Sequence, residues 1–174
     1  MSLKPLPFKI GHQVEDAVTG FTGICTAITY QLSGTIQAHV QPKSPDPNAM
    51  SDTYAIDVEQ IKEVVGGKHV VDLTNPAETP KVRLGEKVRD LTSGFEGVVT
   101  SLTVCFNGCI RANVIAKIKG SSKLTFDGRP PEIVLDHKNL EVIGAGVSED
   151  AKKPVERART GSISTRAPSR RVGR

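Results

Sequence analysis

The sequence has no tryptophan, few other aromatic residues and no long apolar run. Phe and Tyr together make up 4% of its 174 residues, and no stretch of about 18 apolar residues is present to span a membrane. The N-terminus MSLKPLPFKIGHQ lacks the apolar region of a signal peptide, so we expect a protein made in the cytoplasm. A core of Val, Ile and Leu divided among small modules of about 60–70 residues is marginal without partners. These absences favour a chain that works within an assembly.

Cysteine is also scarce, and its odd number excludes a fully paired set of intramolecular disulfides. Cys105 and Cys109 flank an expected hairpin turn, but as a single pair they are a weak metal site. Three interpretations stay open: buried free thiols, an intermolecular disulfide that locks a lattice, or thiols that face each other across the turn. A two-residue Asn-Gly turn would pair Cys105 with Ile110 instead, so the third interpretation needs a longer loop.

No group of residues has the spacing of a catalytic or metal-binding motif. The histidines are isolated from one another and from cysteine, so we expect them on the surface or in loops; they are His12, His39, His69 and His137. Gly66-Gly67-Lys68 lacks the spacing of a phosphate-binding loop. We therefore predict no enzymatic activity, no cofactor and no bound metal.

The positive charge is concentrated at the C-terminal end. Residues 145–174 carry eight Lys or Arg and three acidic residues, a net charge of +5, whereas the other 144 residues carry 15 basic and 16 acidic residues. The segment has almost no large apolar residues and cannot bury enough area to order itself in water. A basic extended tail is therefore expected, with candidate contacts at Arg157, Arg159, Arg166, Arg170, Arg171 and Arg174.

Two segments of the chain repeat each other without a gap. Residues 11–40 align with residues 85–114 at a constant offset of 74, and 12 of the 30 positions are identical. Unrelated segments of this length would share about two residues. The closing segments EVVG (63–66) and EVIG (141–144) match at an offset of 78, which puts four extra residues into the middle loop of the second copy. The chain is therefore an internal duplication.

Each copy contains a Gly-Phe-x-Gly element between two expected strands. Glycine allows positive φ angles or close backbone approach, and phenylalanine supplies a large apolar area. Asp16 and Asp90 precede this element, where an aspartate side chain can hold a turn. Asn107-Gly108 is the dipeptide typical of a type I′ hairpin turn, and Ser33-Gly34 is its weaker counterpart. The expected turn and core positions are Gly20, Phe21, Gly23, Gly94, Phe95, Gly97, Asn107 and Gly108.

The residues around these elements favour short β-strands. ICTAITY (24–30) is rich in β-branched residues, and TIQAHVQP (35–42) alternates between apolar and polar. DVEQI (57–61) and DHKNL (136–140) suit a 3₁₀ turn. We predict an all-β fold of two tandem small SH3-like β-barrels, with glycine kinks that curl each sheet. The expected boundaries are a first module at 1–66, a linker at 67–83, a second module at 84–144 and the tail at 145–174.

The stretch GEKVRDLTSGFEGVVTSLTVCFNGC (85–109) resembles a segment of tailed-bacteriophage proteins of unassigned or virion-structural role. The matching positions are Gly85, Val88, Asp90, Ser93, Gly94, Phe95, Gly97, Asn107, Gly108 and Cys109. The first copy matches less fully, because Ser33 and Thr35 replace Asn and Cys. The same opening resembles, more loosely, the start of KOW and other SH3-like barrels.

The phage resemblance implies a virion component. We therefore expect a non-enzymatic structural protein that decorates or cements the capsid, or that serves as a head-tail connector, in many copies bound to neighbouring capsid or tail subunits. The alternative is a KOW-like nucleic-acid- or ribosome-associated binding module that uses the basic tail, because Lys and Arg give sequence-independent affinity for phosphates. We expect no membrane partner, and nucleic acid would be contacted only through the tail.

Overall fold

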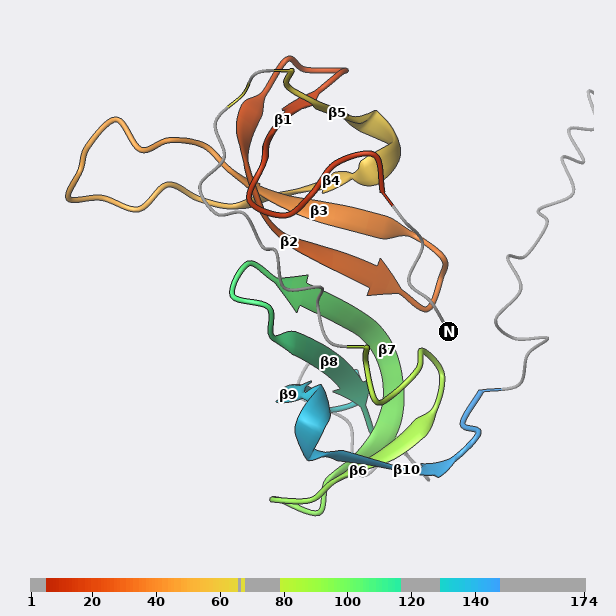
Figure 1. The fold of residues 1–174 in the computed structure, drawn as a ribbon. Coiled ribbons are helices and arrows are strands. Elements are labelled where there is room, and N and C mark those ends of the chain that lie inside the picture. The colour runs from red at the N-terminus through yellow and green to blue at the C-terminus, as the bar shows by residue number, and fades with distance from the viewer. Residues whose placement is uncertain (1–5, 66, 68–78, 117–128, 148–174) are drawn as a thin grey trace, which may run out of the picture.

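A computed structural model describes residues 6–65, 67, 79–116 and 129–147 of the chain. These residues form antiparallel β-strands joined by turns and short 3₁₀ helices, which confirms the expected all-β fold class. Figure 1 shows the first half of the chain above and the second half below. No helix in these ranges is both long and apolar enough to cross a membrane. The expected linker and tail lie largely outside the described residues.

The two halves present the same elements in the same order. The first half contains β1 (Gln13–Asp16), β2 (Thr22–Gln31), β3 (Ile36–Gln41), β4 (Tyr54–Asp57), a 3₁₀ helix (Val58–Gln60) and β5 (Ile61–Glu63). The second half contains β6 (Lys87–Asp90), β7 (Glu96–Cys105), β8 (Ile110–Ile115), β9 (Glu132–Asp136), a 3₁₀ helix (His137–Asn139) and β10 (Leu140–Gly144). The 3₁₀ turns expected in DVEQI and DHKNL are confirmed.

Each half pairs its strands in the same antiparallel pattern. The orders are β5-β1-β2-β3-β4 in the first half and β10-β6-β7-β8-β9 in the second. A register shift in the first part of β2, between Cys25 and Ala27, recurs in β7 between Val99 and Ser101. Among the described strands, β4, β5, β9 and β10 each pair with one neighbour, so the sheet is not closed.

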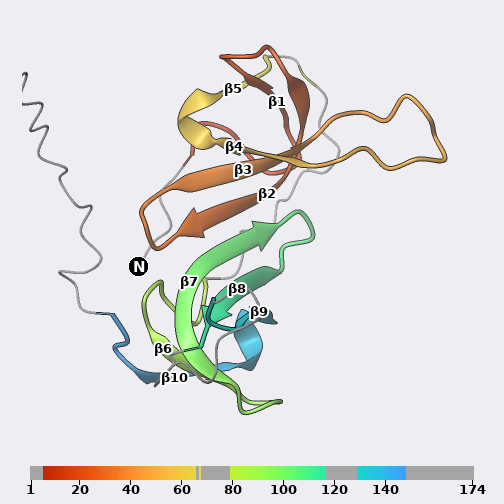
Figure 2. The ribbon, with the colours of Figure 1, turned by 180° about the vertical axis from the view of Figure 1, so that it is seen from behind.

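Strands β2 and β7 join the halves into one sheet, which contains all ten of the described strands. They pair antiparallel, and Thr29 lies opposite Thr103, its own counterpart at the repeat offset of 74. A residue can face its counterpart in an antiparallel pair only where a two-fold axis passes between them. The two halves are therefore related by an internal pseudo-two-fold axis at the β2–β7 seam (Figure 2).

The core formed by the described residues consists of two small clusters, one in each half. The first contains Phe8, Val14, Cys25, Ile28, Ala38, Val40 and Ile61, and the second contains Val82, Val88, Val99, Leu102, Val104, Ile110, Ala112, Val114 and Leu140. With seven and nine buried residues, neither cluster is large. Each fully buried Val or Leu stabilises the fold by about 1.5–3 kcal/mol. Ile10 and Tyr30 contact both clusters and thus join the two cores across the seam.

The Gly-Phe-x-Gly elements have the roles expected for their glycines. Gly20 and Gly94 both have a φ angle of 72°, in the left-handed region that side chains disfavour. A Cβ on Gly23 would lie 2.6 Å from the carbonyl oxygen of Gln41, and one on Gly97 would lie 2.4 Å from that of Ile115. The second glycine of each element therefore allows two strands to approach closely.

The predicted two-residue type I′ turn is wrong. That turn needs positive φ at both central residues, but at the tip of the β7–β8 hairpin only Gly108 has one, 80°. The Cys105 amide donates to the Cys109 carbonyl at 2.9 Å, which leaves residues 106–108 as a three-residue loop. The β2–β3 hairpin is alike, since Gln31 donates to Thr35 at 2.9 Å. Gly108 supplies the left-handed residue that such a loop requires.

Candidate functional site

The seam between the halves carries a polar network on the pseudo-two-fold axis. The hydroxyl groups of Thr29 and Thr103 are hydrogen-bonded to each other at 2.8 Å. The Thr29 hydroxyl also lies 2.8 Å from Nε2 of His39 on β3. Desolvation by burial lowers the pKa of His39 below its usual range. The imidazole therefore prefers its neutral form in this network.

Each hairpin tip extends the seam by one further hydrogen bond to the opposite half. The Leu32 amide donates to the Thr100 carbonyl at 2.8 Å, and the Phe106 amide donates to the Thr26 carbonyl at 2.8 Å. Leu32 and Phe106 are counterparts at the repeat offset. The second-half hairpin is thereby held against β2, with Phe106 beside the first half.

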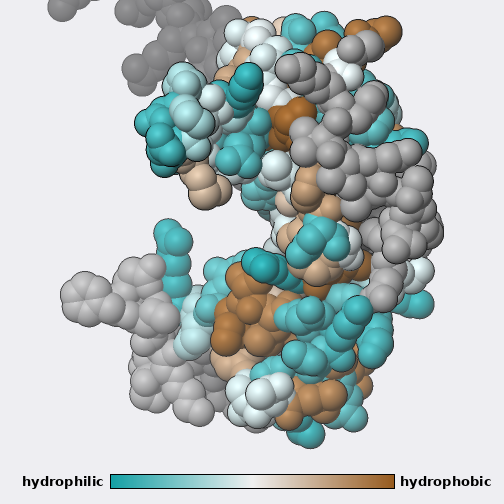
Figure 3. Space-filling view, turned by 60° about the vertical axis from the view of Figure 1, so that its left-hand side comes forward, coloured by the Kyte–Doolittle hydropathy of each residue, from teal (hydrophilic) through white to brown (hydrophobic). Residues whose placement is uncertain are grey.

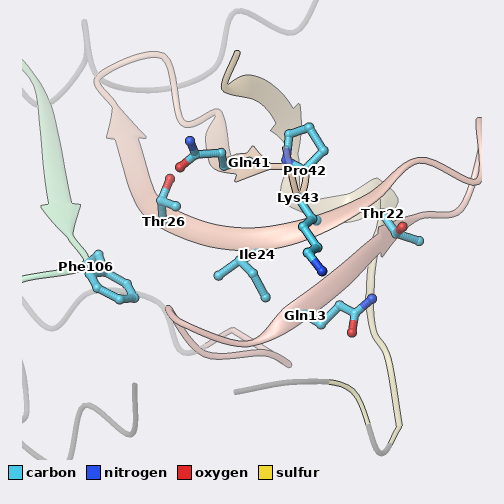
Figure 4. Close-up of a pocket in the computed structure, with 9 residues that line it drawn as sticks. Gln13, Thr22, Ile24, Thr26, Gln41, Pro42, Lys43 and Phe106 are labelled. Atoms are coloured by element: carbon cyan, nitrogen blue, oxygen red, sulfur yellow. The ribbon is translucent and has the colours of Figure 1, made fainter. Parts of the chain in front are cut away.

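A cavity of about 650 Å³ lies where this hairpin meets the first half. Its described lining comes from all three central strands of the first half and from Phe106 of the second; the residues are Gln13, Thr22, Gly23, Ile24, Thr26, Gln41, Pro42, Lys43 and Phe106. In Figure 4 the side chain of Lys43 reaches down past Ile24, and Phe106 stands to one side of Ile24. The cavity thus combines apolar side chains, neutral polar groups and one cation, the mixture of groups that is typical of ligand pockets.

The corresponding surface of the second half carries ion pairs. Glu96, the counterpart of Thr22, contacts Nζ of Lys87 at 2.8 Å and the guanidinium of Arg89 at 2.6 Å. These cations lower the pKa of the Glu96 carboxyl group, chiefly through its hydrogen bond with Lys87. In the first half the same three positions hold Gln13, Glu15 and Thr22, so the halves differ at this surface.

Figure 3 shows one face of the molecule, which is hollowed between the two halves. Hydrophobic side chains gather on the lower wall of the hollow, which belongs to the second half. The long segment between β3 and β4 projects from the first half above it (Figure 1). A partner that enters here would meet both repeats at once.

The three cysteines are free thiols in two different settings. Cys25 is buried in the first core, and burial raises its pKa to about 12. Cys105 and Cys109 are partly buried and lie opposite each other across the hairpin. Burial, and then the hydrogen bond with Cys109, raise the pKa of the Cys105 thiol to about 11. The longer loop thus realises the arrangement that a two-residue turn would have prevented.

We expected the histidines on the surface or in loops, but not all of them lie there. His137 is 2% exposed, and its Nδ1 accepts a hydrogen bond from the Lys81 amide at 3.2 Å. His12 contacts Glu63, and His39 lies in the seam network. The sequence gives no sign of these partners because each contact depends on how the chain folds back on itself. Within the described ranges, no three His, Cys, Asp or Glu residues are grouped to hold a metal ion.

Asp16 and Asp90 hold the turns before each Gly-Phe-x-Gly element. Asp16 accepts hydrogen bonds from the Val18 amide at 3.0 Å and the Thr19 hydroxyl at 2.6 Å. Asp90 accepts from the Ser93 hydroxyl at 2.6 Å and the Ser93 amide at 2.8 Å. In each case the side-chain hydroxyl is the main cause of a lowered pKa. These residues shape the turn and do not converge on a reactive centre.

The predicted turn and core positions do not meet in one site. Gly20, Phe21 and Gly23 lie in the first half, apart from their counterparts Gly94, Phe95 and Gly97, while Asn107 and Gly108 form the hairpin tip. Phe21 is only partly buried and stacks edge-on with Tyr54 at a centroid distance of 5.0 Å. The predicted tail contacts, Arg157, Arg159, Arg166, Arg170, Arg171 and Arg174, and His69 fall outside the described residues.

Sequence reasoning missed two core residues and the seam. Phe8 is 4% exposed, and Val82, which the sequence assigns to the linker, is 1% exposed in the second cluster. They are counterparts at the offset of 74, so extending the alignment upstream of residue 11 would have found them. Nothing in the sequence indicated that Thr29 would meet Thr103, because a repeat pattern does not specify which strand of one copy pairs with the other.

No protein-family model, no curated protein and no solved structure matches this chain.

Proposed function

We propose that this chain is a non-enzymatic structural protein of a tailed-phage virion, which decorates or cements the capsid or connects head and tail. It would act by binding neighbouring virion subunits in multiple copies. The support is the resemblance of residues 85–109, the absence of a metal-holding cluster among the described residues, and the shape of the sheet described above.

The strand arrangement supports an SH3-like interpretation of each half. Five short strands follow one another, the first strand pairs with the fifth, and a 3₁₀ helix separates the fourth from the fifth. Glycines at Gly23 and Gly97 allow the long second strands to bend against β3 and β8. Two such modules, turned about the seam, would form one rigid body with interaction surfaces at both ends.

The observation that carries the proposal is the set of open strand edges. In the described part of the chain, β4 and β9 each have one paired side. Open edges present backbone donors and acceptors to which a neighbouring chain can add a strand. Ile133 and Val134 of β9 are 38% and 59% exposed, so apolar side chains are available beside these backbone groups. Such an edge suits a protein whose neighbours complete it.

The experiment is to locate the protein in particles. Virions of the phage that encodes this sequence should contain it at a fixed ratio to the major capsid or tail subunit, measured by quantitative mass spectrometry of purified particles. A density map of the particle should then place a paired ten-stranded sheet on the shell or at the neck. Its absence from purified virions would overturn the proposal.

The salt dependence of binding to nucleic acid distinguishes the alternative function, a nucleic-acid-binding module, from the virion function. Binding to duplex DNA or RNA through the C-terminal tail should weaken steeply between about 50 and 200 mM salt. A Lys and Arg to Gln variant of residues 152–174 provides the control. Salt-dependent binding by the wild type but not by this variant, together with absence from virions, would favour the nucleic-acid function over the virion function.

A further inference from the structure

The β7–β8 hairpin brings Cys105 and Cys109 opposite each other where its ladder ends. Val104 and Ile110 are the last pair of the ladder, and beyond them the Cys105 amide donates a hydrogen bond to the Cys109 carbonyl at 2.9 Å. Side chains directly opposite each other in an antiparallel pair project from the same face. Cα atoms of opposite residues in antiparallel chains are about 4.5–5.5 Å apart, within the range of about 4.4–6.8 Å that a disulfide spans.

The two thiols are in contact with each other and reachable from solvent. Cys109 is close enough to raise the pKa of the Cys105 thiol, and both residues are partly buried rather than enclosed. The Asn107 side chain accepts a hydrogen bond from the Cys109 amide at 3.1 Å, and the Gly108 amide donates to the Cys105 carbonyl at 2.9 Å. These bonds fix the loop that separates the thiols, so the pair is preorganised.

The hairpin also connects this pair to the seam. Cys105 lies opposite Ala27 of β2, and the neighbouring Phe106 donates its amide to the Thr26 carbonyl. Phe106 in turn lines the cavity between the halves. A change at the thiols therefore acts on the part of the second half that contacts the first.

We propose that Cys105 and Cys109 form a dithiol modification site that small disulfides oxidise to a cross-hairpin disulfide, and that this bond fixes the hairpin against β2. One thiolate attacks a sulfur of oxidised glutathione and releases one glutathione thiol. The second thiolate then attacks the protein sulfur of the mixed disulfide and releases the other. Two protein thiols are oxidised, one small disulfide is reduced, and both protons pass to the two glutathione thiols.

The first half supplies an internal comparison, because its hairpin has Gln31 and Thr35 at these positions and cannot be oxidised. The raised pKa of Cys105 leaves little of its thiolate at neutral pH, so the step in which Cys105 attacks should be slow there and accelerate as the pH rises. Cys25 is buried in the core and should remain a thiol throughout. This inference does not depend on the proposed function.

The test treats the reduced full-length protein with oxidised glutathione under native conditions at about pH 8.5. We expect the number of titratable thiols to fall from three to one, with a mass lower by two hydrogen atoms and a Cys105–Cys109 crosslink in peptide mapping. Hydrogen exchange at the Phe106 amide should slow by about fivefold or more after oxidation, while the 31–35 hairpin stays unchanged.

Two variants complete the design. Cys25→Ser should still form the crosslink, and Cys109→Ser should give only a glutathione adduct. Should Cys109→Ser fail to fold, phenylarsine oxide on the wild type gives a second reading, because one arsenic atom bridges two adjacent thiols with loss of water. Persistent glutathione adducts on the wild type, disulfide-linked dimers, or separate single-thiol products would each overturn the proposal. An unchanged Phe106 exchange rate would overturn its link to the seam.

Discussion

At Gly23 and Gly97 the backbone passes so close to the neighbouring strand that a side chain has no room. A Cβ at Gly97 would lie 2.4 Å from the Ile115 carbonyl oxygen and 2.7 Å from a methyl group of Val114. At Gly34 the situation differs, because a Cβ there would meet nothing within 4 Å but the φ angle is 92°. Glycine is thus required at Gly23 and Gly97 because a Cβ has no room, and at Gly34 because of the left-handed backbone.

Gly97→Ala should therefore destabilise the fold more than Gly34→Ala. We expect a loss of about 3 kcal/mol at Gly97, where strand β8 must move, against about 1 kcal/mol at Gly34, where only the left-handed backbone is disfavoured. Urea unfolding followed by circular dichroism gives both values. Equal losses would mean that β8 relaxes freely away from the new methyl group.

The turn aspartates Asp16 and Asp90, one in each half, lead to a second prediction at this scale. The pKa of Asp90 is lowered from 3.8, chiefly by the Ser93 hydroxyl, so its contribution to stability is present above about pH 4 and is lost as the pH falls through the lowered folded-state pKa. Asp90→Asn should be less stable than the wild type at pH 7, and the difference should shrink toward about pH 3. Denaturant titrations at both pH values test this. A difference that persists undiminished at low pH would assign the effect to shape rather than charge.

At the scale of elements, the seam between β2 and β7 is the contact that joins the two halves. Strands β2 and β7 are each long enough to pair with three neighbours, and their second parts meet each other around Thr29 and Thr103. The two sides of the seam are not identical, since His39 of the first half corresponds to Asn113 of the second. His39 bonds Thr29, whereas Oδ1 of Asn113 is buried without a hydrogen-bond partner.

His39 should make the stability of the seam depend on pH. Burial lowers its pKa from 6.5, so the folded chain binds fewer protons than the unfolded chain. The corresponding stability is complete above about pH 6.5 and is lost as the pH falls from there toward the folded-state pKa. His39→Asn, which copies the second half, should lose less stability than the wild type between about pH 7.5 and 5.5. Parallel urea unfolding series measure the two slopes, and equal slopes would contradict the role of His39.

At the scale of the whole molecule, the described body ends later than the repeat alignment indicates. The Val147 amide donates to the Gly85 carbonyl at 2.8 Å, and Gly146 has a φ angle of 67° beside the same backbone. Val147 thus binds the start of the second half. A truncation that keeps this contact can remove residues only from 148 onward.

Deletion of residues 148–174 should therefore leave the fold and its stability intact. Deletion of residues 145–174 should lower the free energy of unfolding by about 1 kcal/mol, because it removes a backbone hydrogen bond. Thermal unfolding of the two truncations and the full chain measures the difference. On the proposed function, the shorter deletion should still fail to enter particles in an assembly assay. Loss of folding by the 148–174 deletion would show that this segment belongs to the core.

The sequence by itself determined the local features: the duplication, the all-β class, the turns built on Asp16 and Asp90, and the glycines that the strands require. These depend on short-range conformational preferences, which residue types state directly. Only the tertiary structure decided that Thr29 faces Thr103, that Cys105 faces Cys109 across a three-residue loop, that Val82 is core, and that Phe106 lines a cavity of the first half. Strand pairing is made by backbone groups that every residue shares, so the sequence pattern leaves the partner and the register open.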